Sequence, residues 1–209
     1  LLGVLLFHGL VVYGLVLRTL TPLSPAMLRQ KMRRVWAFAF STSSSGATLP
    51  VTLRTVEKRL GVNKSVAGFS VPLGATINMD GTAIMQGVAT VFIAQVYGID
   101  LSSSQLLMVV LTATLASIGT AAVPGVGLIT LSLVLTQAGL PVEGVALIIG
   151  VDRLLDMIRT AVNVTGDATV ATIVAYREGQ LDETVYNDPR ADNDMDAALT
   201  ENPSPGEAP

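Results

Sequence analysis

Residues 151–167, VDRLLDMIRTAVNVTGD, carry a stripe of charged and amide side chains within a long apolar region. Intervals of four, three, four and four residues separate the members of this stripe, which are Asp152, Asp156, Arg159, Asn163 and Asp167. On an α-helix this spacing places all of them on one face, with Thr160 beside them. The stripe therefore predicts one wall of a polar site on an otherwise apolar helix.

The composition favours a multi-pass α-helical membrane protein over a very apolar soluble α-domain. Half of the 209 residues are hydrophobic, the mean hydropathy is +0.58 and only 14% are charged, whereas soluble domains carry about 25% charged residues. No Lys or Arg lies between Lys64 and Arg153, a length that holds roughly three or four membrane-crossing elements of about 20 residues each. The absence of cysteine excludes disulfides, thiolate catalysis and cysteine metal sites.

The first residues, LLGVLLFHGL, start within an apolar helix, so we expect a fragment whose N-terminal part is missing. A cleaved signal peptide is the competing interpretation, but this stretch lacks the basic n-region that such a peptide needs. His8, the single histidine, lies far from the polar motifs in sequence. We expect it to be a packing residue rather than a proton relay.

Two breaks interrupt apolar runs, STSSSGATLP at 41–50 and SIGTAAVPGVG at 117–127. Around them the pattern predicts an all-α membrane protein of six regions. These are the end of a transmembrane helix at 1–20, a re-entrant hairpin at 24–62, a helix containing NMDGT at 64–98, a second re-entrant hairpin at 102–140, a helix at 142–176 and a disordered acidic tail at 177–209.

Basic residues flank only the first two connections, whereas the turns near Asp100 and Glu143 have none. The positive-inside rule therefore predicts that the first two connections are cytoplasmic and the later two external; the C-terminal tail is also expected in the cytoplasm. The hairpins then enter from opposite sides, each followed by a helix with a polar core. Such an inverted repeat is typical of secondary transporters, where paired broken segments mark a site at the membrane midplane. Small residues that merely pack helices together are the alternative.

The charges of the stripe indicate two kinds of ligand. A salt bridge between Asp156 and Arg159 is the simplest structural explanation, but one Arg cannot neutralise three stripe acids, and Asp80 adds to the surplus. Carboxylates and carbonyls are hard oxygen ligands that suit Na⁺ or a proton. The guanidinium fork of Arg159 fits a carboxylate, and half-helix N-termini at the hairpin tips attract anions. Together they predict a pocket for an amino acid with an acidic side chain.

Four segments, STSSSGATLPVT, PLGATINMDGTA, ASIGTAAVPGVG and LDMIRTAVNVTGD, resemble the signature segments of the dicarboxylate/amino acid:cation symporters, the glutamate transporter family. They follow the family's order and spacing, and the resemblance covers residues 1 to about 176. It implies a C-terminal transport-domain fragment of an elevator-type symporter that is homotrimeric at full length. It also implies a multi-pass protein of the plasma or inner membrane, in contact with lipid, that takes up aspartate or glutamate with cations, with no nucleic-acid partner.

The same resemblance implies site residues. For the substrate they are Ser43, Ser44, Ser45, Thr82, Val123, Pro124, Gly125, Gly127, Asp156, Arg159, Thr160 and Asn163. For one sodium ion they are Gly74, Asn78, Asn163 and Asp167; for a second, Thr76, Ser117, Ile118 and Thr120; and for a third, Asn78 and Asp80, with further ligands from the missing helices.

The chain departs from the family pattern at a few positions. Relatives commonly carry a further Arg where this chain has Ser43 or Met157, and Arg153 is a candidate substitute. Ala122 replaces a glycine of the second hairpin tip, which is expected to stiffen it. Because both Asp156 and Arg159 are present, the resemblance points to aspartate or glutamate rather than to C4-dicarboxylates or neutral amino acids.

Several alternatives stay open at this stage. Proton coupling in place of sodium, and a C4-dicarboxylate substrate, fit the same family. A cation or anion channel is a different class, which Arg159 in the stripe disfavours. An intramembrane serine enzyme would need a base near Ser43–Ser45, and the sequence offers none there.

Overall fold

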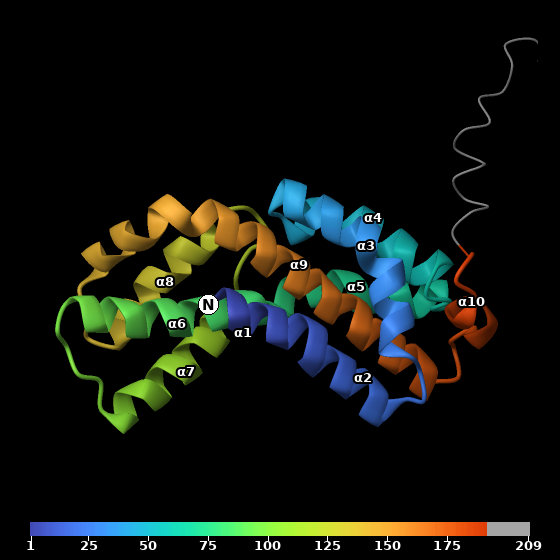
Figure 1. Cartoon of the computed structure of the whole chain (residues 1–209), viewed down its shortest axis with the longest axis horizontal. Coiled ribbons are helices and arrows are strands. Elements are labelled where there is room, and N and C mark those ends of the chain that lie inside the picture. Colours follow the sequence, from blue (N-terminus) through green and yellow to red (C-terminus); the bar gives the residue numbers. More distant parts are fainter. Residues whose placement is uncertain (192–209) are drawn as a thin grey trace, which may run out of the picture.

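In the computed structural model, which describes residues 1–191, the chain forms an elongated bundle of helices (Figure 1). The described part contains no strand, only an isolated bridge between Val62 and Leu181, so the all-helical expectation is confirmed. The helices are α1 (Leu2–Phe7), the π-helical turn η1 (His8–Val12), α2 (Tyr13–Leu20), α3 (Pro25–Thr42), α4 (Ser45–Lys58), α5 (Lys64–Ile77), α6 (Asp80–Val96), α7 (Ser103–Ile118), α8 (Val126–Gln137), the 3₁₀ turn η2 (Val142–Val145), α9 (Ala146–Arg177) and α10 (Glu183–Asn187).

Local sequence signals explain where several helices begin. Pro25 occupies the first turn of α3, where its missing N–H costs nothing. Asn63 caps α5 by accepting a hydrogen bond from the amide of Ser65 at 2.9 Å. Ser102 and Gln105 form a capping box at the start of α7. Each broken region of the sequence analysis thus becomes two helices joined by a short tip.

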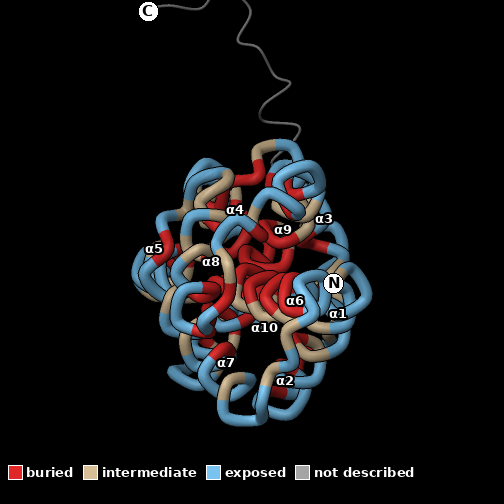
Figure 2. The backbone as a smooth tube through the Cα atoms, turned by 90° about the vertical axis from the view of Figure 1, so that its left-hand side faces the viewer, coloured by how far each residue is buried: buried red, intermediate tan, exposed pale blue. Residues whose placement is uncertain are grey.

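The two helix pairs pack into separate apolar cores that share α9. The first core combines buried residues of α2 to α5, the second half of α9 and α10. The second combines α6, α7, α8 and the first part of α9. In Figure 1 these cores form the right and left halves of the molecule, with the 32-residue α9 running through both. Buried backbone gathers along the middle (Figure 2), and the polar stripe of α9 lies where the halves meet.

Among the described residues, one helical stretch, Leu2–Leu20, is long and apolar enough to cross a membrane, with a mean hydropathy of 1.8. Two shorter apolar helices are Ser103–Ile118 and Val126–Gln137. Their outward faces carry large exposed apolar side chains, for example Leu15, Leu115 and Ile129. These helices therefore present apolar surface that a soluble protein would bury.

The chain after α9 folds back where the sequence analysis expects disorder. Residues 178–188, which we call the C-terminal clasp, include α10 and pair with the segment before α5 through Asn63 N–H to Gln180 O (3.0 Å) and Asp182 N–H to Gly61 O (2.8 Å). Asp182 caps α10, and its hydrogen bonds from Thr184 and Val185 hold its pKa below the ordinary value. Disorder is therefore wrong for the clasp, because apolar Leu181 and Tyr186 have a surface to pack on. Residues 192–209 lie outside the described part.

Candidate functional site between the hairpin tips

Arg159 is the centre of the polar stripe. Its Nη2 donates to Asp156 Oδ1 at 2.8 Å and to Asp152 Oδ1 at 3.1 Å. The side chain is 1% exposed, yet Nε and Nη1 have no hydrogen-bond partner. A buried donor without a partner costs about 1–3 kcal/mol. The internal salt bridge therefore exists but leaves two of the three guanidinium nitrogens with spare donors.

Gly127 of α8 leaves room for this guanidinium. A Cβ at position 127 would lie 2.6 Å from Arg159 Nη1 and 3.1 Å from Met85 Cε. Any side chain at this position would have to displace the ends of the Arg159 and Met85 side chains. Glycine therefore allows α8 to approach Arg159 without moving the guanidinium.

The tips of the two helix pairs touch each other and α9. Ser44 Oγ donates to Ala122 O at 2.7 Å, and the Gly46 amide donates to the same oxygen at 3.0 Å. The Gly125 amide donates to Asp156 Oδ2 at 2.9 Å. The second tip is thus closed over the stripe.

A cavity of about 20 Å³ remains under these tips, room for about one water molecule. Of the predicted substrate residues it is lined by Ser43, Ser45, Thr82, Val123, Gly127, Asp156, Thr160 and Asn163. Ser43 has a left-handed backbone, with φ of 52°, and its buried Oγ has no partner. Ser44 and Gly125 lie at the tip contacts, Arg159 lies beneath Gly127, and Pro124 is exposed.

Asn163 ties α9 to the start of α6. Its Oδ1 accepts the Gly81 amide at 2.8 Å, and its Nδ2 lies 3.5 Å from Thr82 Oγ1 and 3.3 Å from the sulfur of Met79. The side-chain amide of Asn163 is therefore hydrogen-bonded within the protein, next to the cavity.

The residues predicted for the first sodium ion lie together. Asn78 Nδ2 donates to Asp167 Oδ1 at 2.8 Å and to the Asn163 carbonyl at 3.2 Å. A Cβ at Gly74 would lie 2.6 Å from Asp167 Oδ1, so the α5 backbone approaches the carboxylate closely. The described residues contain no cluster of three acidic, His or Cys side chains that could hold a metal. One buried carboxylate among carbonyls fits a monovalent hard cation in donor chemistry.

The residues predicted for the second ion are placed less compactly. Thr76 is exposed on α5, while Ser117 and Thr120 are buried at the end of α7 and Ile118 is 43% exposed. Helices α5 and α7 are in contact, but the hydroxyls of all three polar residues bond within their own segments.

His8, expected to be a packing residue far from the polar motifs, does not lie apart from them in the fold, because its Nε2 is 3.1 Å from Asp80 Oδ2. Tyr13, which the sequence analysis does not single out, donates to the same oxygen at 3.0 Å. The only sequence signal for this cluster is the presence of polar rings in an otherwise apolar helix.

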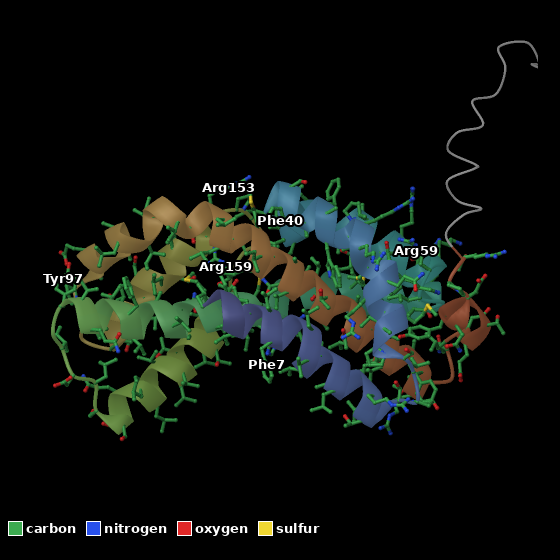
Figure 3. All side chains as sticks on the ribbon, viewed as in Figure 1. Phe7, Phe40, Arg59, Tyr97, Arg153 and Arg159 are labelled. Carbon is green, nitrogen blue, oxygen red and sulfur yellow. The ribbon has the colours of Figure 1, made fainter. Side chains whose placement is uncertain are left out.

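Arg153, the candidate substitute for the further arginine of the relatives, lies away from Arg159. It is exposed and lies at the upper rim of α9 in Figure 3, whereas Arg159 lies inward. Asp152 rather than Arg153 is the additional charged residue that the stripe brings to Arg159.

Comparisons with known proteins agree with the resemblance. The model of the sodium:dicarboxylate symporter family matches residues 1–177. The chain is 50% identical over 179 residues to an excitatory amino acid transporter of Caenorhabditis elegans. This alignment covers 85% of this chain and 36% of the relative. It is 43% identical over 197 residues to excitatory amino acid transporter 2 of Homo sapiens, covering 94% of this chain and 34% of that protein.

The chain spans about a third of the length of these curated relatives. The family and the relatives are transporters, which removes the enzyme alternative. With a family match over residues 1–177 and half of the aligned residues shared with a relative, this chain belongs to the sodium:dicarboxylate symporter family.

Proposed function

We propose that the full-length protein carrying this chain is a secondary active symporter that couples uptake of an acidic amino acid, L-aspartate or L-glutamate, to Na⁺. The observation that carries the proposal is Arg159, which is fully buried with spare donors and lies against Gly127 and Asp156, two residues that line the cavity between the hairpin tips. An acidic side chain is the ligand that would satisfy those donors and justify burying them. The names of the relatives, excitatory amino acid transporters, support the same substrate class.

Each predicted contact has a chemical role in this proposal. Arg159 and Thr82 would bind the side-chain carboxylate, Asp156 and Thr160 the amino group, and Asn163 the α-carboxylate. The amides at the tips, Ser43–Ser45 and Val123–Gly127, would surround the substrate. Asp156 now accepts hydrogen bonds from Arg159 and Gly125, so it would exchange at least one of them for the ammonium group.

The small size of the closed cavity implies that one of the two tips must move before a substrate can bind. At about 20 Å³ it is too small for an amino acid, so the substrate can enter only if a tip withdraws. The second tip is the one we assign to this movement, because Val123 is 54% exposed and Pro124 is exposed, whereas Ser43, Ser44 and Ser45 are all buried.

For the cations, Asp167 with the backbone of Gly74, Asn78 and Asn163 would hold one Na⁺. Thr76, Ser117, Ile118 and Thr120 would hold a second, and Asp80 with Asn78 would contribute to a third. Bound sodium would supply the positive charge that balances these carboxylates. Ser117, Ile118 and Thr120 belong to the same tip as the substrate contacts Val123–Gly127, so we expect affinities for cation and substrate to be linked reciprocally.

The proposal includes the membrane arrangement. Helices α3–α4 and α7–α8 would be re-entrant hairpins entering from opposite sides of the plasma or inner membrane, with the C-terminal tail in the cytoplasm. The N-terminal part of the protein would supply the scaffold and the trimer contacts for an elevator-type movement. The exposed apolar faces of α2, α7 and α8 support contact with lipid.

The test is uptake of labelled L-aspartate by the full-length protein in liposomes, under an inward Na⁺ gradient and, separately, under a proton gradient alone. We expect uptake that requires Na⁺ and is lost in Arg159→Ala. Uptake driven by protons alone would keep the substrate but replace the ion. Absence of aspartate uptake under both gradients, with succinate or a neutral amino acid transported instead, would contradict the proposed substrate, and substrate-independent ion flux alone would favour a channel.

A further inference from the structure

A π-helical turn interrupts the apolar helix Leu2–Leu20. The Tyr13 amide donates to the carbonyl of His8, five residues earlier. In a regular α-helix, residues five apart point about 140° away from each other, because each step turns about 100°. The wider turn brings residues five apart back to one side, and such turns are often found at functional sites.

Both side chains that this turn aligns reach one carboxylate oxygen. His8 Nε2 lies 3.1 Å and Tyr13 Oη 3.0 Å from Asp80 Oδ2, with Nε2 as the donor when it carries the ring proton. The two rings pack edge to face, with centroids 4.7 Å apart. Asp80 Oδ1 accepts no hydrogen bond from any described residue, and the Asp80 side chain is 44% exposed.

Tyr13 also lies against the cluster of Asn78 and Asp167. A Cβ at Gly166 would lie 2.5 Å from Tyr13 Oη and would overlap Asn78 Nδ2. Tyr13 is 6% exposed, so its hydroxyl is enclosed between α6 and α9. The ring therefore links the carboxylate of Asp80 to the neighbouring residues predicted to bind a cation.

We infer that His8 and Tyr13 are positioning residues that fix the carboxylate of Asp80 by holding Oδ2, so that Oδ1 is available to a hard monovalent cation. The inference rests on the proposed sodium coupling. Residues that orient a ligand without touching the ion commonly change ion affinity about 10- to 100-fold when they are replaced. The N-terminal helix would thereby contribute to ion binding without supplying a ligand atom.

The test measures Na⁺ binding without transport, in the purified full-length protein. Melting temperature is followed while NaCl replaces choline chloride at constant ionic strength, which gives the Na⁺ concentration for half-maximal stabilisation. The variants are Tyr13→Phe, which removes only the hydroxyl, His8→Leu, and His8→Gln, which restores a donor of similar reach. Tyr97→Phe is the matched control, because Tyr97 is exposed at the far end of α6 (Figure 3), and Asp80→Asn is the reference for loss of the carboxylate.

We expect Tyr13→Phe and His8→Leu each to raise the half-maximal Na⁺ concentration about 10-fold, and His8→Gln to recover most of the loss. At saturating Na⁺, the His8 and Tyr13 variants should melt close to the parent protein, whereas Asp80→Asn should not. The inference is overturned if Asp80→Asn shifts the Na⁺ dependence but Tyr13→Phe and His8→Leu do not. If Na⁺ does not stabilise the parent protein at all, the proposed sodium coupling fails together with it, and that result is distinguishable from the first.

Discussion

The two hairpins use the same design, a helix, a polar tip and a returning helix, but they are anchored differently. The outer end of α3–α4 is held by the C-terminal clasp. Buried Lys31 donates to the carbonyls of Arg59 (2.6 Å) and Val185 (2.5 Å), and Tyr186 donates to the Ser24 carbonyl at 2.9 Å. The outer end of α7–α8 has no comparable clasp among the described residues. Nearer its tip, this hairpin exposes Leu115 and Ile129 on its outward faces.

This difference indicates a division of labour. The α3–α4 hairpin is fixed at both its base and its tip, so it supplies a constant wall of the site. The α7–α8 hairpin is held through its tip and a single apolar face, so its withdrawal costs little free energy. The hydrogen bonds from Ser44, Gly46 and Gly125 are the contacts that such a withdrawal would break.

The largest effect is expected at Arg159. Arg159→Ala removes the proposed carboxylate-binding group and leaves Asp152 and Asp156 without their cation, so aspartate affinity should fall about 100-fold or more. Equilibrium binding of labelled aspartate at saturating Na⁺ measures this. Arg159→Lys keeps the charge without the fork and should also bind poorly while folding better. Affinity within threefold of the parent in both variants would refute the assignment.

A large effect is also expected inside the second hairpin at Gly127. Gly127→Ala places a methyl group against Arg159 Nη1, so either the guanidinium or α8 must leave its present position, and aspartate affinity should fall about 10-fold, a loss of 1.4 kcal/mol. Gly119→Ala, in the same hairpin, is the control because a Cβ there meets nothing within 4 Å. Equal losses in both variants would show that flexibility of the tip, rather than fit against Arg159, is what matters.

A moderate effect, on stability rather than on binding, is expected at the clasp. Lys31→Met keeps the apolar stem but leaves the carbonyls of Arg59 and Val185 without their donor, which should cost about 1–3 kcal/mol and lower the melting temperature. Lys58→Met, at the exposed end of α4, is the matched control. If Lys31→Met leaves the melting temperature unchanged, the clasp does not anchor the first hairpin.

The smallest effect is expected at Arg153. Because this side chain is exposed at the rim of α9, Arg153→Ala should change aspartate affinity less than about twofold, within the usual ±0.5 kcal/mol of surface substitutions. A tenfold loss would mean that Arg153 substitutes for the arginine that relatives carry elsewhere.

The polar stripe, the two tips and the helix NMDGT could be predicted from the sequence because spacing and composition fix them locally. The pairing of Arg159 with Asp156 could be predicted from their separation of three residues, whereas the additional pairing with Asp152, two turns away, was not predicted. The contact of His8 and Tyr13 with Asp80 could not be predicted, since it depends on a π-helical turn that no residue type signals and on packing across 67 residues or more of sequence. The clasp could not be predicted for a similar reason: its composition is acidic, and only the folded structure shows that Leu181 and Tyr186 pack against the first apolar core.

The division of labour between the hairpins is tested most directly by amide hydrogen exchange in the full-length protein, with and without Na⁺ plus aspartate. We predict that the ligands slow exchange strongly in residues 119–127 of the second tip and only slightly in residues 43–48 of the first. Ser43, Ser44, Ser45 and Thr48 are buried there, and the amides of residues 43, 44 and 46–48 are already hydrogen-bonded. Equal protection of both tips, or protection confined to residues 43–48, would contradict the assignment of the second hairpin as the moving element.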